Sequence, residues 1–185
     1  MMFARTKRLT LRPGWPEDAR ALSEAIGHEA VATKLARVPW PYALGDAEAF
    51  LASQRGSADP RFMILLHDGA ETRLIGGIGI HDEADGTRQL GYWLTPDAWG
   101  RGYATEAGRA VIEMARHALG YKQLHAWHFA DNPASGRVLT KLGFRRTGRV
   151  EPRRSLARGG TAPGIAYALD FDGEQSTDDP VRMAA

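Results

Sequence analysis

The stretch over residues 91–106, GYWLTPDAWGRGYATE, constrains the fold of this chain more than any other. It predicts a strand over 88–95, a turn that contains glycine, and a helix from 104 to about 119. A further strand is expected after the helix, over 123–130. A strand–helix–strand connection of this length makes the two strands parallel neighbours, with the turn at their carboxyl ends. Ligands of such units usually bind at that end.

The turn offers a site for phosphate. Gly100 and Gly102 leave two backbone positions without side chains just before the helix begins. The first amides of a helix have no partner within it and carry about half a positive charge, so a glycine-lined approach favours an anion. An ordinary tight turn explains the same glycines. The chain lacks the Gly-Lys-Ser/Thr of nucleoside triphosphate loops and the G-x-G-x-x-G of dinucleotide folds, which sets both aside.

A second informative stretch follows over residues 131–148, DNPASGRVLTKLGFRRTG. Asn132 suits a helix N-cap and Pro133 suits the first helical position, so the sequence predicts a short helix over 133–141. The polar, glycine-rich segment over 151–164 is expected to be a hairpin loop that leads into the last strand.

These pieces resemble a known family. WGRGYA, NPAS, KLGF and the opening RLTLRPGWPEDA are similar to the GCN5-related N-acetyltransferases (GNAT), in the branch of ribosomal-protein N-terminal acetyltransferases (RimJ/RimL-like). In that family a Q/R-x-x-G-x-G/A segment wraps the pyrophosphate of acetyl-CoA. Gly102 and Ala104 match this segment, and Trp99 replaces its first residue. The resemblance covers residues 7–169, nearly the whole chain.

The resemblance implies an α/β (α+β) fold with a single acetyltransferase domain over residues 1–171. We expect a mixed, mostly antiparallel sheet of about seven strands with about four helices, one of them over 46–56. Strands four and five form the parallel, splayed pair. Residues 172–185 have no apolar period, and we expect them to be a mobile tail.

Acetyl-CoA is the cosubstrate that the resemblance implies, and no metal is expected. His125 and His128 are three residues apart on a predicted strand, so they point to opposite faces, and the other histidines are scattered. The residues that we expect to contact acetyl-CoA lie in the turn and at the start of the short helix: Leu94, Thr95, Trp99, Gly100, Arg101, Gly102, Tyr103, Ala104, Thr105, Asn132, Ser135 and Arg137.

Acetyl transfer from a thioester requires a neutral amine, a polarised carbonyl and a departing thiolate. Deprotonating an α-amine with a pKa near 8 costs roughly 1.4 kcal/mol at pH 7, whereas deprotonating a lysine costs about 4.6 kcal/mol. An α-amine acceptor therefore needs little help from a base. Backbone N–H groups on the strand near Leu94 are expected to polarise the carbonyl.

Three side chains are catalytic candidates: Ser135, Asn132 and His128. The family's usual acid is a tyrosine at the position of Leu139, and in this branch the serine of N-x-x-S, Ser135, takes its place. A plain serine in the first turn of a helix is the alternative. Asn132 caps the helix and would also hold the pantetheine or a water on the amine. His128 is either a base or a core histidine bonded to backbone.

Other polar groups have weaker claims. The segment 81–83, His-Asp-Glu, is a candidate base or an exposed turn, and the amide of Gln89 stands where relatives carry a glutamate. Arg137 and Lys141 would reach the outer phosphates of the cofactor or cover a solvated helix face. The segment around Trp40 packs on the core as a lid or forms a wall of the acceptor pocket.

The composition limits the function classes. Apolar residues make up 43% and charged residues 25%, as in globular proteins. No apolar run of about eighteen residues and no apolar signal segment occur, so we expect no membrane contact and a cytoplasmic location. With 0 cysteines the chain forms no disulfide and cannot carry an acetyl group on a thiol. A net charge of +2 falls short of a nucleic-acid signature, and an oligomer is compatible with the sequence.

The favoured function is an acetyl-CoA-dependent N-acetyltransferase. The acceptor would be a protein N-terminal α-amine or a similar amine, attacking directly in a ternary complex. Two alternatives stay open, a small-molecule amine acetyltransferase and a CoA-binding sensor without turnover. A nucleic-acid binder is the least favoured alternative, and it would use the arginines of the last third of the chain: Arg145, Arg146, Arg149, Arg153, Arg154 and Arg158.

Overall fold

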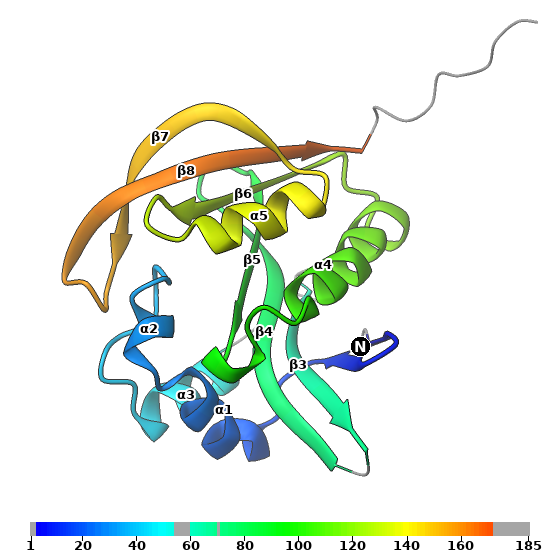
Figure 1. Ribbon diagram of the computed structural model, residues 1–185, viewed down its shortest axis with the longest axis vertical. Helices are drawn as coiled ribbons and strands as arrows, with labels where there is room; N and C mark the ends of the chain where they lie inside the picture. The colour runs from blue at the N-terminus through cyan, green and yellow to red at the C-terminus, as the bar shows by residue number, and fades with distance from the viewer. Residues whose placement is uncertain (1–2, 54–59, 70, 172–185) are drawn as a thin grey trace, which may run out of the picture.

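The computed structural model describes residues 3–53, 60–69 and 71–171. The tail predicted over 172–185 lies outside the described residues, and the domain boundary at 171 stays a prediction. The described residues form one eight-stranded sheet with helices on both faces (Figure 1). The predicted α/β class is therefore confirmed.

The strands follow the order β1-β2-β3-β4-β5-β6-β8-β7 across the sheet. Every neighbouring pair is antiparallel except β5 and β6, which are parallel, as predicted. The eighth strand, β1, was not predicted because two residues are too few to show an alternating pattern. The bounds are β1 Ala4–Arg5, β2 Leu9–Arg12, β3 Arg61–Asp68, β4 Glu71–Asp82, β5 Arg88–Leu94, β6 Gln123–Phe129, β7 Arg145–Ser155 and β8 Gly160–Asp170.

The described ranges contain five α-helices. The extra one, α2, is a single turn, too short to show a helical period. The helix expected over 46–56 begins earlier, because its capping carboxylate, Asp46, accepts from the Ala43 amide at 2.8 Å. It ends at Ala52 with Ser53 as its C-cap, and the rest of the expected range, 54–56, lies outside the described residues. The bounds are α1 Ala19–Ile26, α2 Glu29–Ala32, α3 Leu44–Ala52, α4 Tyr103–Glu113 and α5 Pro133–Lys141; a π-helical turn, Met114–Ala118, prolongs α4, and short 3-10 turns lie at Pro16–Asp18 and Pro96–Ala98.

Two apolar cores lie on opposite faces of the sheet. The larger core joins α4 and α5 to the sheet, and the smaller one joins α1 and α3. Strand β5 contributes to both, because successive side chains point to opposite faces. Leu90, Tyr92 and Leu94 pack toward the larger core, and Trp93 packs against the smaller one.

The hairpin near the C-terminus corrects the sequence prediction. The segment expected as a loop over 151–164 is mostly strand, and only residues 156–159 turn. The ladder continues from the pair Glu151↔Gly164 to the pair Ser155↔Gly160. Because β7 is an edge strand, it needs no alternating apolar pattern, and polar composition alone was misleading.

Strands β5 and β6 separate toward their carboxyl ends. They pair at one position, Gln89↔His125. Further along, each strand is held by its outer neighbour, with Leu94 opposite Gly76 on β4 and Phe129 opposite Gly164 on β8. The separation lies beside the glycine turn and the start of α5, and this places the candidate site.

Candidate active site

The glycine turn requires left-handed backbone at two positions. Gly100 has φ 73° and Gly102 has φ 82°, values that residues with a Cβ rarely adopt. Gly102 is the N-cap of α4, and its carbonyl accepts the first intrahelical bond, from the Glu106 amide at 3.0 Å. The amides before Glu106, at residues 103–105, therefore open the helix without intrahelical acceptors.

Trp99 braces this turn against the end of β5. Its indole Nε1 donates to the Leu94 carbonyl at 2.8 Å, while its ring is 48% exposed. Trp99 thus has a side-chain N–H donor at the position where the family that the sequence resembles carries glutamine or arginine.

The Leu94 amide points into the gap between β5 and β6. The Thr95 amide donates to Ile75 on β4 at 2.9 Å, which fixes its direction. Amides alternate between the two edges of a strand, so the Leu94 amide points to the other edge, toward β6. The single pairing of β5 with β6 lies at the far end, at Gln89. The Leu94 N–H is therefore positioned to donate to a ligand between β5 and β6.

Glu106 anchors the first turn of α4 to the turn between β1 and β2. Its carboxylate accepts from Thr6 Oγ1 at 2.6 Å, from the Arg8 amide at 2.9 Å and from Arg8 Nε at 2.8 Å. Burial opposes ionisation, but these hydrogen bonds outweigh it and lower the pKa of Glu106. Arg8 also donates to the Arg101 carbonyl at 3.2 Å, while the Arg101 side chain is exposed.

Ser135 meets a tyrosine that sequence analysis did not single out. The Tyr92 hydroxyl lies 2.8 Å from Ser135 Oγ and 3.0 Å from the Ser135 carbonyl, which accepts from it. Burial raises the pKa of Tyr92 to about 12, and the hydrogen bond to Ser135 offsets part of that rise. The contact crosses from β5 to α5. A polar hydroxyl at a core-facing strand position, between Leu90 and Leu94, was the signal available in the sequence.

Asn132 caps α5, as predicted. Its Oδ1 accepts from the Ser135 amide at 3.4 Å, and the Asn132 carbonyl accepts from the same amide at 3.1 Å. Asn132 and Ser135 are thus together at the start of α5, beside the carboxyl end of β6. The capping role is direct, and the contact of Asn132 with the cofactor stays a prediction.

His128 is buried under α5, with 4% of its surface exposed. Its Nδ1 lies 2.7 Å from the Phe129 carbonyl, so Nδ1 carries the proton, because a carbonyl only accepts. In the neutral ring Nε2 then accepts from the Tyr167 hydroxyl at 3.3 Å. Both nitrogens are satisfied within the chain, which is the arrangement of a core histidine. A role as base stays a prediction.

His81 and Glu83 lie on the other face of the sheet. His81 Nε2 is 2.9 Å from Glu83 Oε1 and 3.5 Å from Gln89 Nε2. A Cβ on Gly91 would be 3.7 Å from the His81 ring, so the imidazole covers β5 on the side opposite Tyr92. The residues of 81–83 are therefore not an isolated exposed turn.

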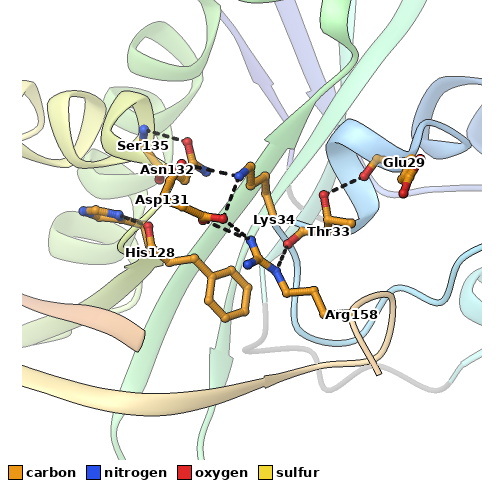
Figure 2. A network of polar contacts seen from close by, with 9 residues as sticks. Glu29, Thr33, Lys34, His128, Asp131, Asn132, Ser135 and Arg158 are labelled. Carbon is orange, nitrogen blue, oxygen red and sulfur yellow. Dashed lines mark hydrogen bonds and ion pairs between the residues drawn. The ribbon is translucent and has the colours of Figure 1, made fainter. Parts of the chain in front are cut away.

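A polar network closes the region between α2, β6 and the β7–β8 hairpin (Figure 2). Asp131 accepts from Arg158 Nη2 at 3.0 Å and pairs with Lys34 Nζ at 3.2 Å. Arg158 Nε donates to the Thr33 carbonyl at 2.6 Å, and its guanidinium lies 4.4 Å from the Phe129 ring centroid. The hydrogen bond from Arg158 is the main cause that lowers the pKa of Asp131.

The same hairpin is fastened to the segment after α2 by two more bonds. Ser155 Oγ, fully buried, donates to the Leu35 carbonyl at 2.8 Å, and the Leu156 amide donates to the Ala36 carbonyl at 3.0 Å. Sequence analysis missed this contact, since no local pattern signals it. Trp40 is 39% exposed, and its place in the acceptor wall stays a prediction.

The described residues show neither a metal cluster nor a membrane span. Within them, no three His, Asp or Glu side chains gather as a metal site would need. None of the helices in the described ranges is both long enough and apolar enough to cross a membrane.

Comparison with known proteins adds a family to this geometry. The sequence profile described as "Acetyltransferase (GNAT) domain" matches residues 8–145. The chain belongs to this family. As a GNAT protein it is an acetyltransferase. A relative named uncharacterized N-acetyltransferase YoaA, from Bacillus subtilis (strain 168), is 31% identical over 161 residues, covering 84% of this chain and 89% of the relative.

Solved structures share the GNAT fold. The ribosomal-protein-S5-alanine acetyltransferase from Vibrio fischeri aligns with a TM-score of 0.77 at 16% identity, over 94% of this chain and 98% of its own. The microcin C7 self immunity acetyltransferase MccE, solved in complex with acetyl-CoA and AMP, aligns with a TM-score of 0.74 at 20% identity, over 90% and 94%. The family predicted from the sequence is confirmed.

The GNAT domain of this chain lacks the usual tyrosine of α5. Leu139 stands at that position, and it is 1% exposed and packs in the larger core. A hydroxyl at residue 139 would therefore be surrounded by apolar side chains. The hydroxyl of Tyr92 on β5 contacts Ser135 in the first turn of the same helix.

Proposed function

We propose that this acetyltransferase moves the acetyl group of acetyl-CoA to a protein N-terminal α-amine, by direct attack in a ternary complex. The observation that carries the proposal is the hydrogen bond between Tyr92 and Ser135, which joins β5 to α5 beside the separated carboxyl ends of β5 and β6. A thioester held between those strands would meet two hydroxyl groups at its sulfur.

The glycine turn would hold the pyrophosphate of acetyl-CoA. The amides of residues 103–105 have no intrahelical acceptors, and the left-handed Gly100 and Gly102 let the backbone approach an anion closely. Trp99, Arg101 and Thr105 border the same turn. That MccE was solved with acetyl-CoA on the same fold supports this placement. Asn132 would contact the pantetheine at the start of α5.

Backbone at the end of β5 would polarise the acetyl carbonyl. The Leu94 amide points into the gap, so it would donate to the carbonyl oxygen and stabilise the negative charge that develops on attack. A backbone donor needs no reorganisation, and one such donor is worth roughly 3–4 kcal/mol in acyl transfer. The thioester supplies the electrophilic carbon, and the amine nitrogen forms the new bond as the C–S bond breaks.

Ser135 and Tyr92 would stabilise the departing thiolate as hydrogen-bond donors. With its pKa raised to about 12, Tyr92 remains protonated at neutral pH. Full transfer of its proton to a thiolate whose thiol has a pKa near 8.5 would cost roughly 5 kcal/mol, so Tyr92 does not act as the acid. Instead, Ser135 would donate its proton to the sulfur, and the single Tyr92 proton would turn from the Ser135 carbonyl to Ser135 Oγ.

An α-amine acceptor fits a site whose predicted base is engaged within the chain. His128, predicted as a base, has both ring nitrogens engaged within the chain. A site with a weak base suits an α-amine far better than a lysine. Deprotonating an α-amine at pH 7 costs only about 1.4 kcal/mol. The structural relationship to a ribosomal-protein-S5-alanine acetyltransferase supports the same acceptor class.

An acceptor screen tests this function. Free thiol released from acetyl-CoA is measured with peptides that have a free N-terminus, with Nα-blocked peptides that contain lysine, and with polyamines and amino sugars. We expect release with the free N-termini and little with the blocked peptides. Release with small amines alone would replace the proposed acceptor. CoA binding without thiol release from any acceptor would instead indicate a sensor.

A further inference from the structure

A second depression lies between α5 and the β7–β8 hairpin, with a volume of about 380 Å³. Arg137, Thr140 and Lys141 of α5 line one side, and Arg146 of β7 lines the other. Tyr167 of β8 is also part of the lining and is 1% exposed. Three cationic side chains therefore surround one small space.

This depression is on the opposite side of α5 from the proposed acetyl-CoA cleft. Ser135 contacts Tyr92, and Leu142 lies close to Gly108 of α4, so this side of α5 faces α4 and β5. Two residues along a helix change direction by about 200°, which turns Arg137 away from Ser135. The depression is therefore not part of the space between β5 and β6.

The three cations lack acidic partners. Within the described part of the chain, no carboxylate forms an ion pair with Arg137, Lys141 or Arg146. Arg137 and Lys141 are four residues apart on one helix, where like charges destabilise by a few tenths of a kcal/mol. A bound anion would remove this repulsion.

The lining is also fixed in place from behind. Arg146 Nε donates to the Tyr167 hydroxyl at 3.1 Å, and that hydroxyl lies 3.3 Å from His128 Nε2 in the core. This holds the Arg146 guanidinium at the depression through its Nε. Thr140 Oγ1 donates to the Gly136 carbonyl at 3.0 Å, so the hydroxyl oxygen remains an acceptor.

We propose that this depression binds a phosphate group. Two guanidinium groups and one ammonium match the several oxygens of a phosphate better than the two of a carboxylate, and guanidinium binds phosphate with paired N–H donors. The phosphate belongs to a separate phosphorylated small molecule, because the depression lies on the opposite side of α5 from the proposed acetyl-CoA cleft.

Inorganic phosphate is the probe for this site. The melting temperature of the full chain is followed as sodium phosphate replaces sodium chloride at constant ionic strength. We expect a saturable rise in the wild type and about tenfold weaker phosphate binding in Lys141→Ala and Arg146→Ala, because each removes charged hydrogen bonds. Arg149→Ala is the matched control, an exposed arginine of β7 outside the lining, and it should bind like the wild type.

Two further arms identify the source and protect the conclusion. A phosphate response that persists with coenzyme A at saturation indicates a separate ligand. Tighter binding of coenzyme A than of 3′-dephospho-coenzyme A, with the difference lost in Lys141→Ala, would mean that the depression holds the coenzyme's own phosphate and would overturn the separate ligand. If Arg146→Ala folds poorly, Arg137→Ala on the exposed helix surface replaces it. An equal response in all variants, or none beyond that to chloride, overturns the proposal, whether or not the chain transfers acetyl groups.

Discussion

The two sides of the proposed active site are built in different ways. The cofactor side comes from one continuous segment, in which β5, the glycine turn and α4 follow each other along the chain. The side that we propose for the acceptor, around the network of Asp131, Lys34 and Arg158, is assembled from three distant segments, since the Arg158–Thr33 bond joins residues 125 positions apart. Local backbone geometry makes the first side, and long-range polar contacts make the second. Changes in the first should therefore affect acetyl-CoA, and changes in the second should affect the acceptor.

The largest effect is expected from Gly102→Val, on the cofactor side. Valine at φ 82° is strained, which should displace the first amides of α4. We expect the Kd of acetyl-CoA to rise by tenfold or more, as about 1–2 kcal/mol of strain implies. Titration of the purified variant with acetyl-CoA measures the change.

The control for Gly102→Val is Gly45→Ala, in the first turn of α3. Nothing lies within 4 Å of the position of its Cβ, and its φ is not positive. Alanine there should leave acetyl-CoA binding unchanged and stabilise the helix slightly. Wild-type affinity in Gly102→Val would mean that the turn does not bind the cofactor.

Where the two sides meet, Tyr92→Phe and Ser135→Ala should lower kcat about tenfold each, with the KM for acetyl-CoA nearly unchanged. Each removes a hydrogen bond that would strengthen as the thiolate forms. Because the two hydroxyls act as one unit, the kcat of the double variant should be only a little lower than that of the less active single variant. Fully additive losses in this double-mutant cycle would show that the hydroxyls act independently.

A smaller effect is expected from Asp131→Asn, on the acceptor side. The substitution weakens the ties of Lys34 and Arg158 to the end of β6. We expect the KM for a peptide acceptor to rise about fivefold, as for a loss near 1 kcal/mol, with acetyl-CoA affinity unchanged. Glu48→Gln, an exposed residue of α3, is the charge-matched control and should leave both constants as they are.

The smallest expected effect is on the pH dependence of protein stability, through the Asp131 carboxylate. Because the pKa of Asp131 is lowered in the folded chain, its ion pairs stabilise the protein at pH above the ordinary aspartate pKa, about 3.9. This contribution is lost as the pH falls through the folded pKa. The stability difference between wild type and Asp131→Asn, within about 1 kcal/mol because the group is half exposed, should be constant from pH 7 to 5. Urea unfolding from pH 7 to below pH 4 measures this stability difference. A difference that grows below pH 4 would contradict the assignment.

Sequence patterns predicted the glycine turn, the α5 cap and the parallel pair well because their signals are local. The glycines, the N-cap Asn132 and the alternation in β5 are each set by residues close in sequence, and the structure has the turn, the cap and the parallel pair. Tyr92 was missed although it is in the same strand, because its partner, Ser135, lies 43 positions away. The hairpin over 151–164 was predicted as a loop because a polar edge strand has no apolar pattern.

By itself the sequence determined the family, the order of strands and helices and the phosphate-compatible turn, since short-range sterics and periodicity fix these features. Only the tertiary structure decided which polar groups meet. The tertiary structure placed Tyr92 against Ser135, buried His128 beneath α5, and brought Arg146 and Lys141 to the lining of one depression. Contacts between distant residues depend on how the helices pack on both faces of the sheet, and no local pattern encodes that packing.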